Sequence, residues 1–350
     1  MFHYHEGHRY TGAFLYDAIV SKGYLWVEFF FCLSGFILYY VYAPRLAEAL
    51  KARPIASFLA ARVSRIYPLQ VATLLFVLAI ELYWRISAWI GSGTGLFEKA
   101  LPATRSAGSF FSNLFMVQAW NIHDRLTWNA PAWFVSVEFL LYLVTPALFL
   151  LAGAKFGWRT MLLGALSVAL LILIAATSGR GLDVTFYNGI FRGLAEFGVG
   201  VYLGALFVAI KARGGKALPD IAHTAAQIGV IALLLAGFIF GGRARTIDDL
   251  MVAGPIFALI FLLAFDRGLI ARGLSAKFLA RAGEWAFAIY MVHFTVLLSL
   301  AFFGFQDRPL MELILAVGLS VAAGAILFGA VEQPLGEKMR KGLARLFGVA

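Results

Sequence analysis

Three histidines lie within the first eight residues of the chain, at positions 3, 5 and 8. An imidazole has an unperturbed pKa of about 6.5, which suits it to general base chemistry near neutral pH. His3, His5 and His8 are therefore candidates for proton transfer. A polar, histidine-rich terminus also occurs without any catalytic role, and the spacing alone leaves both interpretations open.

Two glutamates lie within apolar stretches. Glu28 is near the start of the run from Gly23 to Tyr42, which carries Ser34 at its middle, and Glu138 lies about two helical turns after Pro131. A carboxylate inside a bilayer costs about 3 kcal/mol on insertion scales, so by default it faces a protein-lined cavity. The alternatives are interfacial water for Glu28, and an arginine on another helix for Glu138.

Arg192 and Glu196 are four residues apart in a later apolar run. They can satisfy each other on one helix face, and they are also the obvious source of a partner for Glu138. Just beyond them, Gly200 and Gly204 form a small-xxx-small face, which predicts a close contact between helices.

Arg62 and Arg65 are three residues apart, so they share one helix face, and Tyr67 and Pro68 follow them. We expect Tyr67 and Pro68 to open the next helix, because proline is well tolerated in a first turn. Planar guanidinium groups are suited to binding phosphate. The alternative is that the pair serves only as a cytoplasmic topology signal and contacts lipid headgroups.

Two further side chains lie where they could support a site. Trp133 is near the start of the helix that carries Glu138, where an interfacial aromatic belt is the simpler interpretation. His293 lies about two turns into a later apolar helix, after Tyr290. A histidine in this setting is either a hydrogen-bonded packing residue or a base.

The composition restricts the class of protein. Hydrophobic residues make up 61% of the chain and charged residues 14%, and the mean hydropathy of +0.83 excludes an ordinary soluble protein. The net charge of +10 does not require nucleic acid, because membrane proteins concentrate Lys and Arg in cytoplasmic loops. A single cysteine, Cys32, excludes an internal disulfide and makes a metal cluster improbable. We expect one integral membrane domain over residues 1–350.

Hydropathy predicts an all-α bundle of nine helices. They lie near residues 24–43, 66–86, 131–152, 159–176, 189–210, 225–241, 249–265, 285–303 and 309–331, with the longest loop over 87–130. One set of alternate loops carries 18 Lys and Arg residues and the opposite set carries 10, which predicts a cytoplasmic C-terminus and an outer N-terminus. An outer, polar N-terminus without a preceding helix suggests that the chain begins late, past the middle of a first helix.

Taken in order, these stretches resemble the acyltransferase-3 family of integral membrane acyltransferases, which includes O-acetyltransferases of cell-surface polysaccharides. The matching pieces span essentially the whole chain. They are Phe2-His3-Tyr4, Gly23 to Phe36, Arg62 to Pro68, Pro131 to Glu138, Glu284 to His293, and Val331-Glu332-Gln333-Pro334.

The resemblance implies a ten-helix fold in the cell membrane, acyl-CoA (often acetyl-CoA) as co-substrate without a bound cofactor or metal, and a carbohydrate or lipid-linked glycan hydroxyl as acceptor. His3 best matches the family's essential histidine, with His5 as runner-up, and the family's accompanying arginine would lie upstream of Met1. Glu28 stands where an aspartate is more usual. Arg62, Arg65 and Tyr67 would then hold the CoA phosphates. Glu138 or Glu28 would orient the imidazole, and Ser34, Trp133, Arg192, Glu196 and His293 would support the site.

A proton-coupled secondary transporter is the rival interpretation. Intramembrane Glu28, Glu138, Glu196 and His293 would then form a proton relay. Such a transporter is expected to carry internal repeats with paired broken helices, and comparison of the two halves of the sequence reveals no such symmetry.

Overall fold

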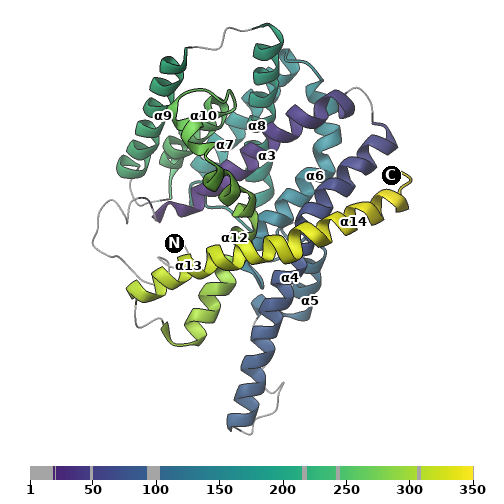
Figure 1. Cartoon of the computed structure of the whole chain (residues 1–350), viewed down its shortest axis with the longest axis vertical. Coiled ribbons are helices and arrows are strands. Elements are labelled where there is room, and N and C mark those ends of the chain that lie inside the picture. Colours follow the sequence, from purple (N-terminus) through teal and green to yellow (C-terminus); the bar gives the residue numbers. More distant parts are fainter. Residues whose placement is uncertain are drawn as a thin grey trace. The chain divides into compact units, whose positions relative to one another are not determined.

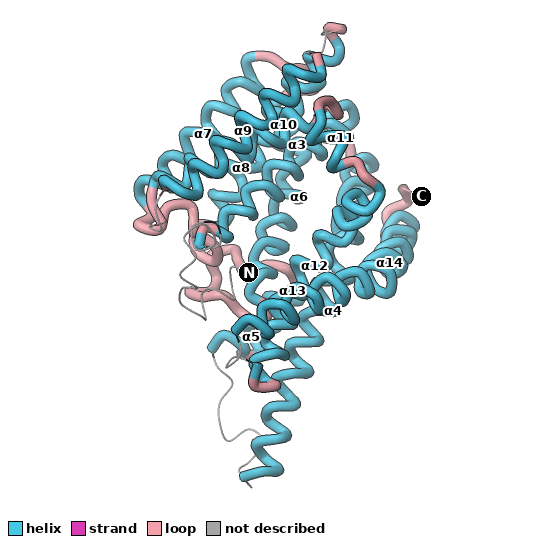
Figure 2. Tube along the Cα trace, turned by 60° about the vertical axis from the view of Figure 1, so that its left-hand side comes forward, coloured by secondary structure: helices cyan, strands magenta, loops and turns pink. Residues whose placement is uncertain are grey.

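The computed structural model describes residues 19, 21–47, 50–92, 103–214, 219–241, 245–305 and 309–349. Within these ranges every regular element is a helix and no strand occurs (Figure 2). This confirms the predicted all-α class. His3, His5 and His8 lie outside the described residues.

The chain divides into two compact units, each built from segments that are distant in sequence. The first unit contains Met1–Phe58, Leu140–Val184 and Asn188–Arg281, and the second contains Leu59–Phe139, Thr185–Tyr187 and Ala282–Ala350. The prediction of one integral membrane domain over the whole chain stays a prediction.

The first unit is built around helices α3 and α8, which pack closely against each other (Figure 1). Its helices are α3 (Trp26–Leu46), α7 (Trp158–Thr177), α8 (Gly189–Ala212), α9 (Asp220–Phe240), α10 (Leu250–Leu263) and α11 (Leu269–Leu274), together with the 3-10 turns Gly23–Leu25 and Ile247–Asp249. It also contains the larger part of α6, from Leu140 to Ala152. α7 packs against α8, and α10 packs against α9 and α3.

Glycines allow α3 and α8 to approach backbone to backbone. A Cβ atom on Gly35 would lie 2.1 Å from the carbonyl oxygen of Phe197, and one on Gly200 would lie 2.0 Å from that of Cys32. A Cβ on Gly204 would meet the carbonyl of Phe36 at 2.9 Å. The close helix contact predicted from Gly200 and Gly204 is therefore confirmed, and α3 is the partner helix.

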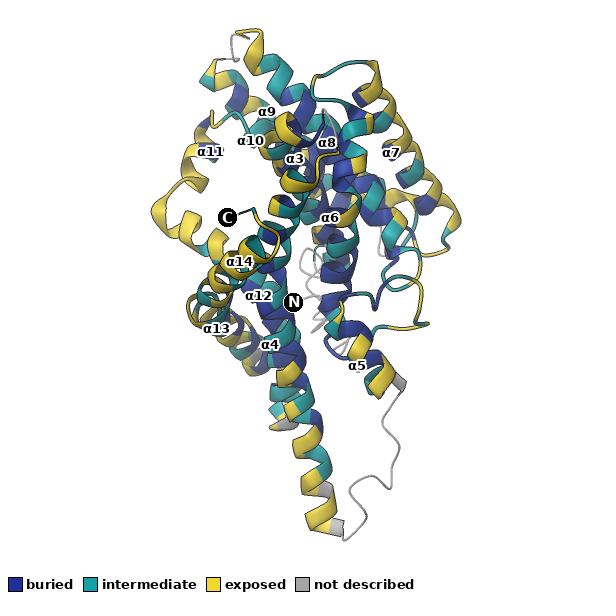
Figure 3. Ribbon diagram, turned by 90° about the vertical axis from the view of Figure 1, so that its right-hand side faces the viewer, coloured by how far each residue is buried: buried dark blue, intermediate teal, exposed yellow. Residues whose placement is uncertain are grey.

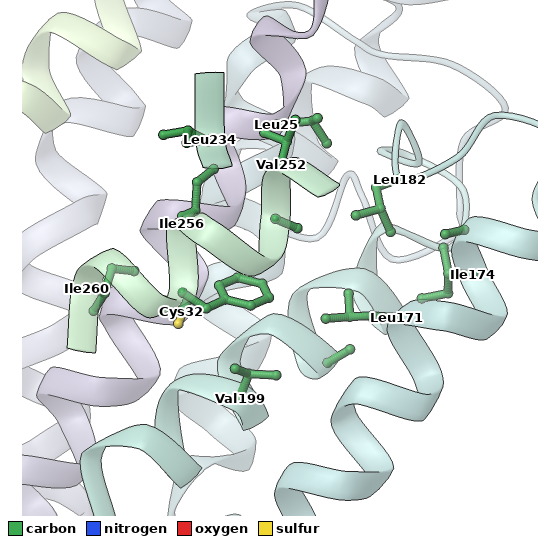
Figure 4. Close-up of a cluster of buried hydrophobic side chains, with 14 of the residues drawn as sticks. Leu25, Cys32, Leu171, Ile174, Leu182, Val199, Leu234, Val252, Ile256 and Ile260 are labelled. Carbon is green, nitrogen blue, oxygen red and sulfur yellow. The ribbon is translucent and has the colours of Figure 1, made fainter. Parts of the chain in front are cut away.

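A hydrophobic cluster fills the space beside this contact (Figure 4). Cys32 of α3, Leu171 of α7 and Val199 of α8 lie in it with Val252 and Ile256 of α10. Cys32 is a buried free thiol. Within a bilayer, lipid is as apolar as these side chains, so close van der Waals packing stabilises the cluster.

The second unit contains most of α4 (Ala52–Ser92), the start of α6 (Trp133–Ala152) and most of α12 (Lys277–Phe302). Its shorter elements are the 3-10 turns Ala103–Arg105 and Ala130–Ala132 and helix α5 (Ala107–Leu114). The chain ends in α13 (Pro309–Leu327), a π-helical turn (Phe328–Glu332) and α14 (Gln333–Leu346), which run on from one another as one rod in Figure 1.

The structure differs from the predicted helix limits in three places. α12 begins at Lys277 rather than near residue 285. α4 begins at Ala52 rather than near residue 66, so Tyr67 and Pro68 lie inside a helix and do not open one. The stretch 52–65 is rich in Ala and Arg, which are strong helix formers, and its charges are tolerated at a helix surface. The predicted loop over 87–130 contains α5, whose first turn is capped by the Ser106 side chain accepting a hydrogen bond from the Ser109 N–H.

Eight helices among the described residues are long and apolar enough to cross a membrane. They correspond to eight of the nine predicted helices, and the ninth is present as α10, which has only 14 residues and is too short for this criterion. The protein is therefore a multi-pass helical membrane protein.

Candidate active site

Arg192 is the centre of a buried ionic group in the first unit. Its Nε donates a hydrogen bond to Glu196 Oε1 at 2.9 Å, and its Nη2 donates to the Glu28 carboxylate and to the Tyr24 carbonyl, the latter at 3.0 Å. Its Nη1 donates to the Val184 carbonyl at 3.3 Å. None of the three charged side chains is exposed.

The pairing within α8 was predictable, and the pairing across to α3 was not predicted. Arg192 and Glu196 do satisfy each other at the i, i+4 spacing expected from the sequence. The contact with Glu28 follows from the parallel packing of α3 on α8. Glu28 lies seven residues before Gly35 and Arg192 lies eight before Gly200, so both charges lie about two turns from the glycine contact. That matched spacing is the signal that could have found the pair.

The buried group holds two helices together. Breaking a buried ion pair by removing one partner is strongly destabilising, because it leaves an uncompensated charge out of water. One guanidinium serves two carboxylates and two backbone carbonyls here, so Arg192 fixes α3, α8 and the chain before α8 in one arrangement. Ser34, two turns further along α3 than Glu28, is half-buried.

A second buried group lies at the start of α3. Lys22 Nζ and the Tyr24 hydroxyl donate to Asp249 Oδ1 at 2.6 and 2.7 Å, and the Leu182 N–H donates to Asp249 Oδ2 at 2.8 Å. Tyr24 joins the two groups, since its carbonyl accepts from Arg192. Lys22 and Asp249 gave no signal of this contact in the sequence, because each lies at the end of an apolar run, where a charge is expected.

The predicted phosphate-binding residues lie on α4 in the second unit. The side chain of Arg65 is 45% exposed and its Nη1 donates to Glu332 Oε1, whose side chain is 1% exposed. Arg62 lies one turn earlier and Tyr67 two residues later, both half-buried. The ion pair with Glu332 was not predicted, and it ties α4 to the end of the π-helical turn after α13.

The start of α6 is held against α12 near His293. Asn129 Nδ2 donates to the Met291 carbonyl at 3.0 Å, and the Tyr290 hydroxyl donates to the Pro131 carbonyl at 3.0 Å. The His293 ring lies 5.7 Å from the ring of Tyr290, centroid to centroid. Trp133, next along α6, is buried.

The hydrogen bond of His293 fixes its tautomer. Its Nδ1 lies 2.6 Å from the Tyr290 carbonyl oxygen, which can only accept, so Nδ1 carries the hydrogen. In the neutral ring Nε2 is then the nitrogen that can accept a proton. The half-buried ring therefore meets the chemical requirement for a base, although it is on the helix predicted only to support the site.

Glu138 is buried, with 4% of the residue exposed, in the second turn of α6. The turn before it is anchored by polar contacts from residues 118–120. Gln118 donates to the Ala132 carbonyl at 2.8 Å, the Ala119 N–H donates to Ser136 Oγ at 3.0 Å, and Trp120 Nε1 donates to the Ser136 carbonyl at 2.9 Å.

The structure thus brings Glu28, Arg192 and Glu196 together in the first unit. In the second unit it places the arginines and Tyr67 on α4, Trp133 and Glu138 on α6, and His293 on α12. Among the described residues no group of three or more His, Cys, Asp or Glu side chains could hold a metal ion.

Comparison with known proteins decides the family, because the acyltransferase domain model of the acyltransferase-3 family matches residues 2–329. The chain belongs to the acyltransferase-3 family. It is also similar to the acyltransferase MdmB of Streptomyces mycarofaciens, with 27% identity over 303 residues, which is 80% of this chain and 69% of MdmB. The comparison with solved structures gave no significant match.

Family membership confirms the resemblance seen in the sequence and makes the protein a membrane-bound acyltransferase. It also decides against the transporter interpretation. The acyltransferase-3 match includes every predicted site residue from His3 to His293, whereas Glu332 and α14 lie beyond its last matched residue.

Proposed function

We propose that this acyltransferase moves an acyl group, most simply acetyl, from cytoplasmic acyl-CoA to a hydroxyl group of a carbohydrate or lipid-linked glycan at the cell membrane. The observation that carries the proposal is the partly exposed guanidinium of Arg65 on α4, with Arg62 one turn away. Two guanidinium groups on one helix face suit the phosphates of coenzyme A.

The partner of Arg65 is compatible with this role. The guanidinium of Arg65 is reached by solvent, so water screens part of its attraction to Glu332. Arg65 uses one of its five N–H donors on Glu332. A phosphate group can therefore share this guanidinium with Glu332 or displace the carboxylate.

In the proposed reaction His3, or failing that His5, acts as general base. The imidazole takes the proton of the acceptor hydroxyl, the hydroxyl oxygen bonds to the thioester carbonyl carbon, and the carbon–sulfur bond breaks. The proton then passes from the imidazolium to the leaving thiolate, giving an ester and free coenzyme A. Glu138 or Glu28 would orient the imidazole as the acid does in a catalytic triad.

The described contacts suggest different roles for the two glutamates. Glu28 is held by Arg192 in a group without any exposure, which favours a positioning role through the α3–α8 contact. Glu138 belongs to the same unit as His293, which we propose supports the site through its Nε2. The surplus of Lys and Arg in alternate loops supports a cytoplasmic C-terminus. The same orientation puts Arg62 and Arg65 on the cytoplasmic side, where acyl-CoA is present.

The test is acyl transfer by the purified protein in vesicles, with labelled acetyl-CoA and a panel of carbohydrate and lipid-linked glycan acceptors. We expect label to appear in an ester of at least one acceptor. His3→Ala is expected to abolish transfer while the protein still inserts into the membrane. If activity is unchanged by His3→Ala, the base is His5 or another residue. If wild-type protein neither binds coenzyme A nor forms any ester, the proposed donor is wrong.

A further inference from the structure

Glu332 lies at a junction where the end of the chain is pressed against α4. The π-helical turn Phe328–Glu332 leads into α14, and Pro334 in the first turn of α14 has no N–H to donate. Pro68 likewise leaves the Ser64 carbonyl of α4 without its helical donor. A Cβ on Gly336 would lie 2.8 Å from that Ser64 oxygen, so α14 approaches α4 backbone to backbone, next to Arg65.

The two partners of the ion pair depend on each other unequally. Glu332 is nearly fully buried, its Oε1 accepts from Arg65, and its Oε2 has no hydrogen-bond partner within the described ranges. Arg65 is almost half exposed. The carboxylate is therefore compensated by this one arginine, while the arginine also faces solvent, from which another anion can reach it.

A carboxylate and a phosphate make the same contact with a guanidinium, since both present two oxygens to a planar pair of N–H donors. Glu332 occupies Nη1 of Arg65, so a phosphate cannot make the bidentate contact on the edge that includes Nη1 until the carboxylate leaves that nitrogen. We propose that Glu332 is an internal competitor for the phosphate-binding face of Arg65, so that it weakens binding of acyl-CoA and speeds release of the coenzyme A product. This inference rests on the proposed use of acyl-CoA.

The charges that follow Glu332 fit this role. α14 carries Lys338, Arg340, Lys341 and Arg345 against one acid, Glu337, and contains no buried residue (Figure 3). This basic helix raises the local concentration of anions near α4. In such a field a carboxylate held at Arg65 limits how tightly a polyanionic product is retained.

The test is calorimetric binding of coenzyme A and of pantetheine, which lacks the phosphates, to the full chain in detergent. Glu332→Gln keeps the shape of the side chain and removes its charge. We expect the Kd for coenzyme A to fall about two- to fivefold, which corresponds to the strength of a partly exposed ion pair. The Kd for pantetheine is expected to stay the same.

Two controls separate competition from a general change in charge. Glu337→Gln removes one negative charge from the same region, but Glu337 pairs with Lys341 at 2.8 Å and is exposed, so we expect no change in the Kd for coenzyme A. In an Arg65→Gln background, Glu332→Gln is expected to have no effect on that Kd. Should Glu332→Gln fail to fold, Glu332→Asp, which has a shorter reach, is expected to tighten coenzyme A binding by a smaller factor.

The inference is overturned if Glu332→Gln leaves or weakens coenzyme A binding, if it changes pantetheine binding equally, or if its effect persists without Arg65. Wild-type binding distinguishes this failure from a wrong donor. If wild-type protein binds coenzyme A and the variant binds no tighter, only the role of Glu332 is wrong. If no variant and no wild-type protein binds coenzyme A, the acyl-CoA proposal is wrong as well.

Discussion

Two arginine–glutamate groups in this protein differ mainly in their access to water. Arg192 with Glu28 and Glu196 is completely buried in the first unit, and the arginine donates to two carboxylates and two carbonyls. Arg65 with Glu332 in the second unit is a single contact from a guanidinium that is nearly half exposed. The first group suits a fixed scaffold, whereas the second can exchange its carboxylate for a substrate phosphate.

The largest effect is expected from Arg192→Met. It leaves two carboxylates buried without their cation, and we expect a loss of about 3–5 kcal/mol of stability. Thermal unfolding in detergent measures this. Arg192→Lys keeps the charge but cannot serve four acceptors at once, so it should fall between wild type and Arg192→Met. If Arg192→Met unfolds at the same temperature as wild type, this group does not stabilise the fold.

Gly200→Ala tests the helix contact that positions the buried group. The added Cβ would lie 2.0 Å from the Cys32 carbonyl oxygen, so α3 and α8 must separate. Overpacking of this kind typically costs about 1–3 kcal/mol. The matched control is Gly229→Ala in α9, where a Cβ meets nothing within 4 Å and alanine is the better helix former. Equal unfolding temperatures for the two variants would contradict the close contact.

Arg65→Gln is expected to lower donor affinity. Loss of one charge-assisted contact to phosphate should raise the KM for acetyl-CoA about tenfold. The unfolding temperature should also fall, because the buried Glu332 carboxylate loses its cation, but by less than in Arg192→Met, since the Gln side chain can still donate a hydrogen bond to it. Arg125→Gln is the control, since Arg125 is an exposed arginine whose hydrogen bond lowers the pKa of Asp124 at a surface turn. A similar rise in KM for both variants would point to a general charge effect.

Salt is expected to have the smallest effect, and to act on donor binding by the exposed Arg65 rather than on the buried Arg192 group. Raising ionic strength from about 0.1 M to about 1 M shortens the screening length from about 10 to about 3 Å. We therefore expect the KM for acetyl-CoA to rise a few-fold, while the salt dependence of unfolding is the same for wild type and Arg65→Gln. A KM that does not respond to salt would contradict an electrostatic contact between Arg65 and the donor.

Much of the fold follows from sequence because hydropathy reports directly on which segments can enter a bilayer. The apolar runs gave the helices, and the glycines of α8 predicted the close contact that the structure shows with α3. The start of α4 was missed because Arg62 and Arg65 are charged and a following proline is typical of a first turn. In the structure Pro68 is inside the helix.

The candidate site was predicted less completely. The positions of charged residues inside apolar runs predicted which of them are buried, and the i, i+4 spacing predicted the contact between Arg192 and Glu196. The partners that lie far apart in sequence, Glu28 with Arg192 and Arg65 with Glu332, depend on how helices pack. A single sequence carries no direct record of that packing. The matched spacing of Glu28 and Arg192 from their glycines is a sequence signal from which the first pair could have been predicted, but it was not used.

The most direct test of the account compares two donors, acetyl-CoA and acetyl-pantetheine, which carry the same thioester and differ in the phosphates. Wild-type protein should prefer acetyl-CoA in kcat/KM. In the Arg62→Gln, Arg65→Gln double variant the ratio of the two kcat/KM values should fall towards one, because only the activity with acetyl-CoA decreases. An unchanged preference in the double variant would contradict phosphate recognition by these two arginines.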